Sequence, residues 1–155
     1  MLSENDARLN LCPECGAPVP TSASCQANFQ ALLALEWDIP GGPGETPHFF
    51  AVATYGIQHP GSMNYTQETV NGLLSAMRDV LDGRASIADI RARVREHAAS
   101  IGRVTRRDGD KVPFNQVEAW PTVVTDVVAG GVEEYQERVE QWARSVVEAL
   151  NSFHA

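Results

Sequence analysis

The chain has 155 residues, of which 43% are hydrophobic, and a formal net charge of −8. This length fits one domain, and the apolar content is enough to build its core. The negative charge argues against a general binder of nucleic acids or anionic membranes, because phosphates repel such a chain at long range. The sequence has no apolar run of membrane-spanning length and its first ten residues do not resemble a signal peptide, so we expect a cytoplasmic protein.

One stretch departs from the acidic balance. Seven arginines lie between Arg84 and Arg107, against only Asp89 and Glu96. A solvated helix face that pairs with acidic neighbours is the favoured interpretation, and a docking site for an anionic partner or substrate is the alternative.

The first 25 residues are not expected to form helices. Residues 1–11 are interpreted as a flexible leader and residues 12–25 as a loop, because Pro13, Gly16, Pro18 and Pro20 oppose regular structure. Such a loop needs a cross-link to become ordered. A helical body is expected over 26–155.

Apolar spacing then predicts two helices in succession. The first runs over about 25–37, with Ser24 as its N-cap. The second starts at Thr46 and Pro47, a favourable capping pair, and ends before the segment His-Pro-Gly. It is apolar nearly all round, which predicts a central position in the fold.

Two more helices follow in the middle of the chain. The third is predicted over 66–81, with Gly83 at its C-terminal cap. The fourth is predicted over 86–98, because Ser86 and Asp89 have nearly the spacing of a capping box. Its inward line is expected to contain Ile87, Ile90, Val94 and Ala98.

The last third of the chain is less regular. Residues 101–116 suit a small hairpin or an extended surface loop, and the run at 122–131 suits either a short helix or a strand. A clear helical stripe follows, formed by Val132, Tyr135, Val139, Trp142, Val146, Leu150 and Phe153. The sequence therefore predicts an all-α single domain of five or six helices that follows an N-terminal loop.

The strongest chemical signal is Cys12-Pro-Glu-Cys15-Gly16. A C-x-x-C pair followed by glycine is typical of a zinc knuckle, in which the glycine adopts the positive φ that the turn needs. With Cys25 the chain has three cysteines, an odd number that favours ligands over disulfides in a reducing cytosol. A redox pair and inert thiols are the alternatives.

A zinc site needs a fourth ligand, and the sequence offers four histidines that can supply it. His154 is next to the C-terminus, and His97 lies in an arginine-rich helix where an exposed position is expected. His48 and His59 lie at opposite ends of one predicted helix, about 16 Å apart, so one ion cannot bind both. If the first two helices are antiparallel, His59 lies at the same end as Cys25, which predicts a zinc site of Cys12, Cys15, Cys25 and His59.

A second polar set accompanies the first two helices. Glu36 and His48 are expected to approach each other across the connecting loop, with Tyr55 and Gln58 as further candidates. Such a set is a general acid/base pair, a second metal site or a structural hydrogen bond.

Four features of the sequence together resemble a bacterial family of small proteins described only as a domain of unknown function. They are the cysteine pair in Cys-Pro-Glu-Cys-Gly at 12–16, Cys25 at the start of a leucine-rich helix, a helix led by His48 that ends in Tyr-x-x-Gln-His-Pro at 55–60, and the C-terminal segment 139–150. The resemblance covers most of the chain. It implies a metal-dependent helical fold and no particular activity.

Two functions are consistent with these features. The first is a zinc-stabilised accessory or binding module, because four protein ligands leave no position for water. The second is a small metalloenzyme or acid/base enzyme, such as a biosynthetic enzyme, with a pocket around His48, Glu36 and Tyr55. A protein or a small molecule is the expected partner, and a membrane or nucleic acid is not.

Overall fold

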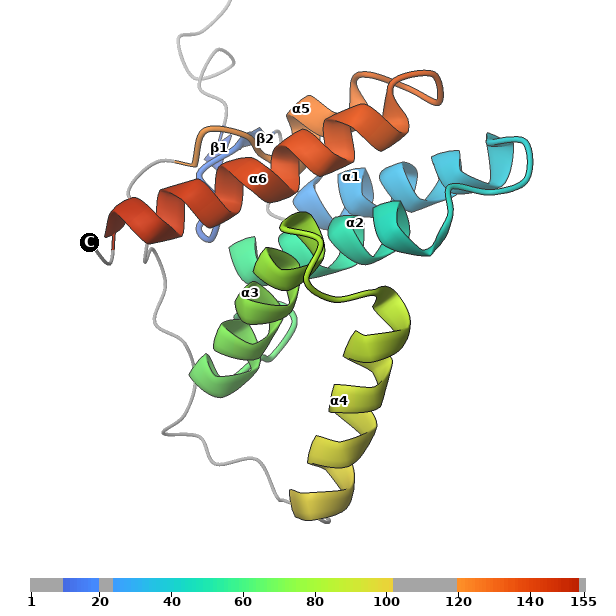
Figure 1. Ribbon diagram of the computed structural model, residues 1–155. Coiled ribbons are helices and arrows are strands. Elements are labelled where there is room, and N and C mark those ends of the chain that lie inside the picture. Colours follow the sequence, from blue (N-terminus) through green and yellow to red (C-terminus); the bar gives the residue numbers. More distant parts are fainter. Residues whose placement is uncertain (1–9, 20–23, 102–119, 154–155) are drawn as a thin grey trace, which may run out of the picture.

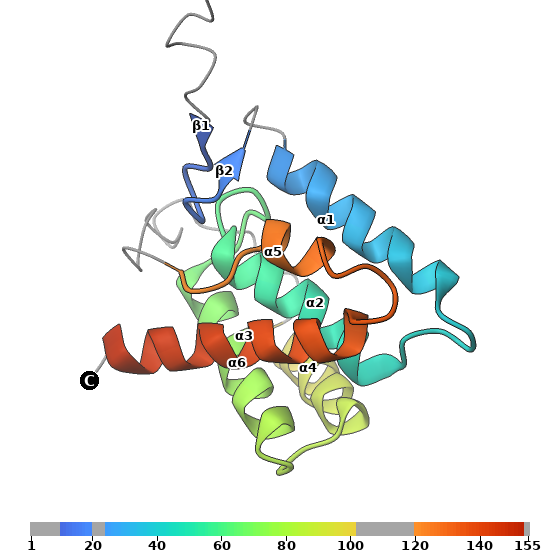
Figure 2. The same cartoon turned by 90° about the horizontal axis from the view of Figure 1, so that it is seen from above.

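The central helix of the fold is α2 (Glu45–Gln58), as its nearly uniform apolar character predicted. The computed structural model describes residues 10–19, 24–101 and 120–153. Within them, α2 packs against α3 (Gln67–Leu81) and α6 (Tyr135–Phe153), as Figures 1 and 2 show. Its buried residues are Phe50, Ala51, Ala53, Thr54, Tyr55, Gly56, Ile57 and Gln58.

A second pair of helices covers this centre. Helix α1 (Ser24–Leu35) runs into a 3₁₀ turn, η2 (Glu36–Asp38), and packs against the short α5 (Val124–Val128). Figure 2 shows α5 lying between α1 and α6. The run at 122–131, which suited either a helix or a strand, therefore contains a helix. The prediction of an all-α single domain is confirmed.

The helix boundaries agree with the sequence at α3 and α4. The Thr66 side chain accepts a hydrogen bond from the Thr69 amide at 3.1 Å, and Gly83 has φ 73° just beyond the end of α3. Helix α4 (Ile87–Ile101) starts with a reciprocal cap, in which Ser86 and Asp89 each bind the other's amide. The hydrogen bonds from Ser86 lower the pKa of Asp89.

The start of α2 differs from the prediction. The helix begins at Glu45 and is preceded by Gly44, whose φ of 89° favours glycine. Thr46 is therefore inside the helix and is not its cap, and Pro47 lies in the first turn, where a missing amide hydrogen bond costs nothing. Likewise, Ser24 is the first residue of α1.

Helix α4 extends away from the helical body, as Figure 1 shows. Ile87 and Ile90 in its first turn are buried, but Val94 is 63% exposed, so the predicted inward position of Val94 is wrong. The reason is that an apolar spacing alone cannot show where along a helix its packing partner ends. The side chain of Ala98 lies outside the described residues.

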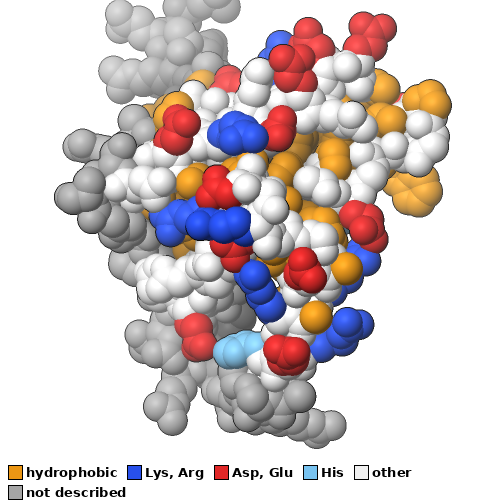
Figure 3. Space-filling model, in the orientation of Figure 1, with side chains coloured by type: hydrophobic (Ala, Val, Ile, Leu, Met, Phe, Trp, Pro, Cys, Tyr) orange, Lys and Arg blue, Asp and Glu red, His pale blue; other side chains and the backbone are white. Residues whose placement is uncertain are grey.

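The arginines on and before α4 pair with acidic neighbours. Arg93 binds Asp79 at 2.7 Å, Arg91 binds Glu45 at 2.7 Å, and Arg84 binds Asp82 at 2.8 Å. Figure 3 shows basic and acidic side chains interspersed on this face. These pairs support a solvated helix face over an anion-docking site. The arginines at 103, 106 and 107 lie outside the described residues.

The long C-terminal helix forms one wall of the core. Its buried residues are Tyr135, Val139, Trp142, Ala143, Val146 and Leu150. They include every member of the predicted stripe from Tyr135 to Leu150. Val132 lies before the helix, and the side chain of Phe153 lies outside the described residues.

The knuckle loop is flanked by two short strands that the sequence did not predict. β1 (Asn10–Leu11) pairs antiparallel with β2 (Pro18–Val19), and Leu11 is opposite Pro18. β1 thus takes up the last two residues of the stretch interpreted as a leader. The hairpin predicted near 101–116 lies almost entirely outside the described residues. In the described part of the chain, no helix has the length and apolarity needed to span a membrane.

Candidate metal centre

Four buried side chains meet where the knuckle, α1 and α2 come together. Cys12 and Cys15 come from the loop between β1 and β2, Cys25 from the first turn of α1, and His59 from the residue after α2. Their potential ligand atoms all lie within 4.8 Å of one another. The structure thus brings together the four residues that the sequence selected, and they form a possible metal-binding site.

The knuckle turn has the local geometry expected of a thiolate-binding loop. The Cys12 amide donates to the Ala17 carbonyl at 2.8 Å, and the Gly16 amide donates to the Cys12 carbonyl at 2.9 Å. Gly16 has φ 77°, as predicted for the glycine after the second cysteine. The turn therefore holds Cys12 and Cys15 on one side of the loop.

The sulfur atoms of Cys15 and Cys25 are 3.6 Å apart. Two thiolates bound to one tetrahedral zinc at about 2.3 Å would lie about 3.8 Å apart, so this spacing suits a shared ion. A hydrogen bond from the Cys25 thiol lowers the pKa of Cys15 to about 4, and the Ala17 amide acts in the same direction. The same bond raises the pKa of Cys25.

His59 presents one ring nitrogen to the three sulfurs. Its Nδ1 lies 2.9 Å from the Tyr55 carbonyl, and since a carbonyl only accepts, Nδ1 carries the proton. Nε2 then holds a lone pair, is buried, and has no hydrogen-bond partner within the described structure. A backbone carbonyl on Nδ1 with a free Nε2 is the usual arrangement of a metal-binding histidine.

Tyr55 belongs to the metal centre and not to the set around His48. Its ring stacks on the His59 imidazole with centroids 4.1 Å apart, and on Phe29 with centroids 4.0 Å apart. Burial, followed by the nearby cysteines, raises the pKa of Tyr55. The predicted grouping of Tyr55 with His48 and Glu36 is therefore corrected, because Tyr55 lies at the other end of α2. The stacked Tyr55 ring restricts the orientation of the His59 imidazole.

Gln58 ties the end of α2 to two other parts of the fold. Its amide donates to the Thr122 carbonyl at 2.8 Å, and its carbonyl accepts from the indole of Trp142 at 3.2 Å. Gln58 is 1% exposed, so both groups would otherwise be unsatisfied in the core. The sequence analysis offered Gln58 as a candidate for the set around His48, but, like Tyr55, it lies at the other end of α2.

Glu14 also takes part in this centre, and sequence reasoning missed it. Its buried carboxylate binds the turn that follows His59. The spacing of a C-x-x-C pair identifies the cysteines but says nothing about the residues between them. An exposed position is the ordinary expectation for a glutamate in a loop.

Glu36 and His48 meet at the opposite end of α2, as predicted. Nδ1 of His48 lies 2.8 Å from the Glu36 carboxylate, whose other oxygen accepts a hydrogen bond from the Tyr135 hydroxyl. The His48 side chain is 53% exposed and that of Glu36 is 13% exposed. Burial, together with the Glu36 contact, raises the pKa of Tyr135. Tyr135 is the third member of this set, which sequence reasoning assigned only to the core.

The separation of the two sets gives a direct prediction. Replacing His48 by Gln is expected to leave metal binding at the predicted zinc site intact. It is expected to lower the free energy of unfolding by at most about 1 kcal/mol, because the side chain is half exposed and Glu36 still accepts the hydrogen bond from Tyr135. His59→Gln is the matched control and is expected to lose tight zinc. The metal content of both purified variants is the measurement. Loss of zinc from the His48 variant alone would show that the two histidines have been assigned in reverse.

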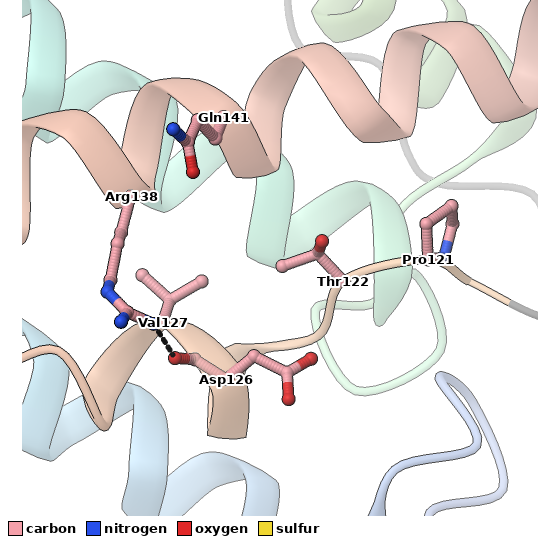
Figure 4. A pocket seen from close by; sticks show the side chains of 6 residues that line it. All are labelled: Pro121, Thr122, Asp126, Val127, Arg138 and Gln141. Carbon is pink, nitrogen blue, oxygen red and sulfur yellow. Dashed lines mark hydrogen bonds between the residues drawn. The ribbon is translucent and has the colours of Figure 1, made fainter.

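A cavity of about 250 Å³ lies between α5 and α6, and its lining includes no residue of either set. Figure 4 shows its lining residues, which are Pro121, Thr122, Asp126, Val127, Arg138 and Gln141. The Arg138 guanidinium donates to the Asp126 carbonyl at 3.1 Å and to the Glu134 carboxylate. The positive charge of Arg138 is thus already paired with Glu134 within the chain.

Comparison with known proteins assigns the chain to a family. A search of the curated proteins and a search of the solved structures each gave no match. The family model described as "Family of unknown function (DUF5946)" matches residues 10–151, which contain the four candidate ligands and the described helices from α1 to α6, except for the last two residues of α6. With nearly its whole length matched, the chain belongs to the DUF5946 family.

Proposed function

We propose that this protein binds one zinc ion through Cys12, Cys15, Cys25 and His59, and that the ion holds the fold together. The observation that carries the proposal is the buried Nε2 of His59, which has no hydrogen-bond partner in the described structure and lies among three buried thiols. A buried polar atom without a partner is costly, and a bound metal ion would remove that cost.

The donor set favours zinc over other ions. Three thiolates and one imidazole are soft ligands of the kind found in structural zinc sites, whereas calcium and magnesium require oxygen. Four protein ligands fill a tetrahedral sphere and leave no position for water. A closed site of this kind supports a structural role and favours a non-catalytic accessory or binding module.

The setting of the site agrees with a reducing compartment. All three cysteines are free thiols in the structure, and thiols persist in the cytoplasm, which is the proposed location. A protein or a small molecule is the proposed partner. Nucleic acid is disfavoured by the net charge of −8, and the described arginines of the basic stretch include three that are paired within the chain.

The stoichiometry of bound metal tests this function. We expect one zinc per chain that survives dialysis against a weak chelator, together with a cobalt-substituted form whose spectrum shows sulfur-to-cobalt charge transfer and tetrahedral d–d bands. Purified protein without tightly held metal would contradict the proposal. A second, exchangeable metal would favour an enzyme instead.

A small acid/base enzyme is the second candidate. The observation that favours it is the Glu36 carboxylate, which is held by Tyr135 and in turn holds Nδ1 of His48. This arrangement would orient the imidazole and leave Nε2 available as a general base. If this candidate is correct, any activity found is expected to disappear in His48→Gln while the zinc content stays at one per chain.

A further inference from the structure

Glu14 stands between the two cysteines of the knuckle, yet its side chain points into the protein. The residue is 7% exposed. Its carboxylate accepts hydrogen bonds from the amides of Gly61 at 2.6 Å and Ser62 at 3.2 Å, and from the Ser62 hydroxyl. Glu14 therefore links the knuckle to the turn that follows α2.

The partners of this carboxylate are unusual for a buried acid. A buried charge is costly unless it is paired or well hydrogen-bonded. In the ranges that the structure describes, the groups that bind Glu14 are two backbone amides and a hydroxyl, with no ion pair to Lys or Arg. Three donors satisfy the buried oxygens of this one carboxylate and fix the distance between the two segments.

The segment that Glu14 holds is the one that carries His59. Gly61 and Ser62 follow His59 by two and three residues, and the turn is closed by the Met63 amide on the His59 carbonyl at 3.0 Å. A second hydrogen bond, from the Tyr65 amide to the Pro60 carbonyl at 2.8 Å, completes it. Because this turn is tightly bonded, an anchor at Gly61 and Ser62 also fixes the backbone of His59.

We propose that Glu14 is a positioning residue for the metal centre, which holds His59 at the distance from Cys12 and Cys15 that a single ion requires. The inference rests on the proposed zinc site. Without the carboxylate, the three thiolates remain, but the His59 imidazole is no longer held at the position that the ion requires. Water then takes the fourth position, and a closed site becomes an open one.

Cobalt titration of three proteins tests the role of Glu14. The wild type is compared with Glu14→Gln, which keeps the size of the side chain but replaces one acceptor by a donor facing other donors. Glu133→Gln, an exposed acid before α6, is the matched control. For Glu14→Gln we expect at least ~10-fold weaker cobalt binding, at least ~10-fold faster zinc release to a chelator, and altered d–d bands. Glu133→Gln should match the wild type.

The outcomes separate this inference from the zinc site itself. If the wild type binds no cobalt with thiolate charge-transfer bands, the proposed site fails. If the wild type does, but Glu14→Gln matches it in affinity, release rate and spectrum, then only the role of Glu14 is overturned. Should Glu14→Gln not fold, Ser62→Ala removes one donor and leaves both amides. It is expected to shift affinity and release in the same direction by less, and wild-type values for it would overturn the inference.

Discussion

Complete removal of zinc is expected to lower the thermal unfolding midpoint by about 10–20 °C. The reason is that structural zinc in small domains contributes about 10–16 kcal/mol of binding free energy, which is also folding free energy. The helical core of this chain has packing of its own that does not depend on zinc, so we expect removal of the ion to lower the free energy of unfolding by only about 5 kcal/mol. Each 1 kcal/mol corresponds to about 2–4 °C in the unfolding midpoint of a chain of this size. Besides the proposed ion, two-residue strands and Glu14 anchor the knuckle.

Thermal unfolding followed by circular dichroism, with and without a strong chelator, is the measurement. Restoring zinc in excess of the chelator is the control, and it should return the midpoint to its starting value. An unchanged midpoint after complete removal of the metal would contradict a structural role. Metal binding at this site would then make no contribution to the stability of the fold.

Replacing Trp142 by Ala is expected to lower the free energy of unfolding by about 3–5 kcal/mol while leaving the zinc bound. Trp142 is 0% exposed and is among the largest fully buried side chains of the described structure. Its removal leaves a cavity and also leaves the buried carbonyl of Gln58 without its indole partner. None of the four candidate ligands is altered.

Trp37 provides a matched control for this experiment. It is 90% exposed, so Trp37→Ala removes the same atoms at almost no cost in burial and is expected to change stability by less than about 0.5 kcal/mol. Chemical denaturation of the zinc-loaded variants is the measurement. Equal effects of the two substitutions would show that the core around α6 is not packed as described.

Most of the helical architecture could be predicted from the sequence, since it depends on local signals. Thr66, Ser86 and Gly83 mark helix ends through caps that involve only neighbouring residues. The stripe of α6 follows from its spacing. Val94 was misplaced because its burial depends on where α4 leaves the body, which is a property of the tertiary fold.

The candidate ligands could also be selected from the sequence, because their types and spacing limit the possibilities strongly. His59 was chosen over His48 from the lengths of the first two helices and their expected antiparallel pairing, and the two histidines lie at opposite ends of α2 in the structure. The residues around the ligands could not be identified in this way. Glu14 and Tyr135 act through partners 47 and 99 residues away, and no local pattern shows such a pairing.

X-ray absorption at the zinc edge of the wild-type protein tests the central claim most directly. A closed site of three cysteines and one histidine predicts a four-coordinate ion with three sulfur atoms at about 2.3 Å and one nitrogen at about 2.0 Å, together with the outer-shell scattering of one imidazole ring. A shell with fewer than three sulfur atoms, or a fourth ligand that is water oxygen without imidazole scattering, would contradict it.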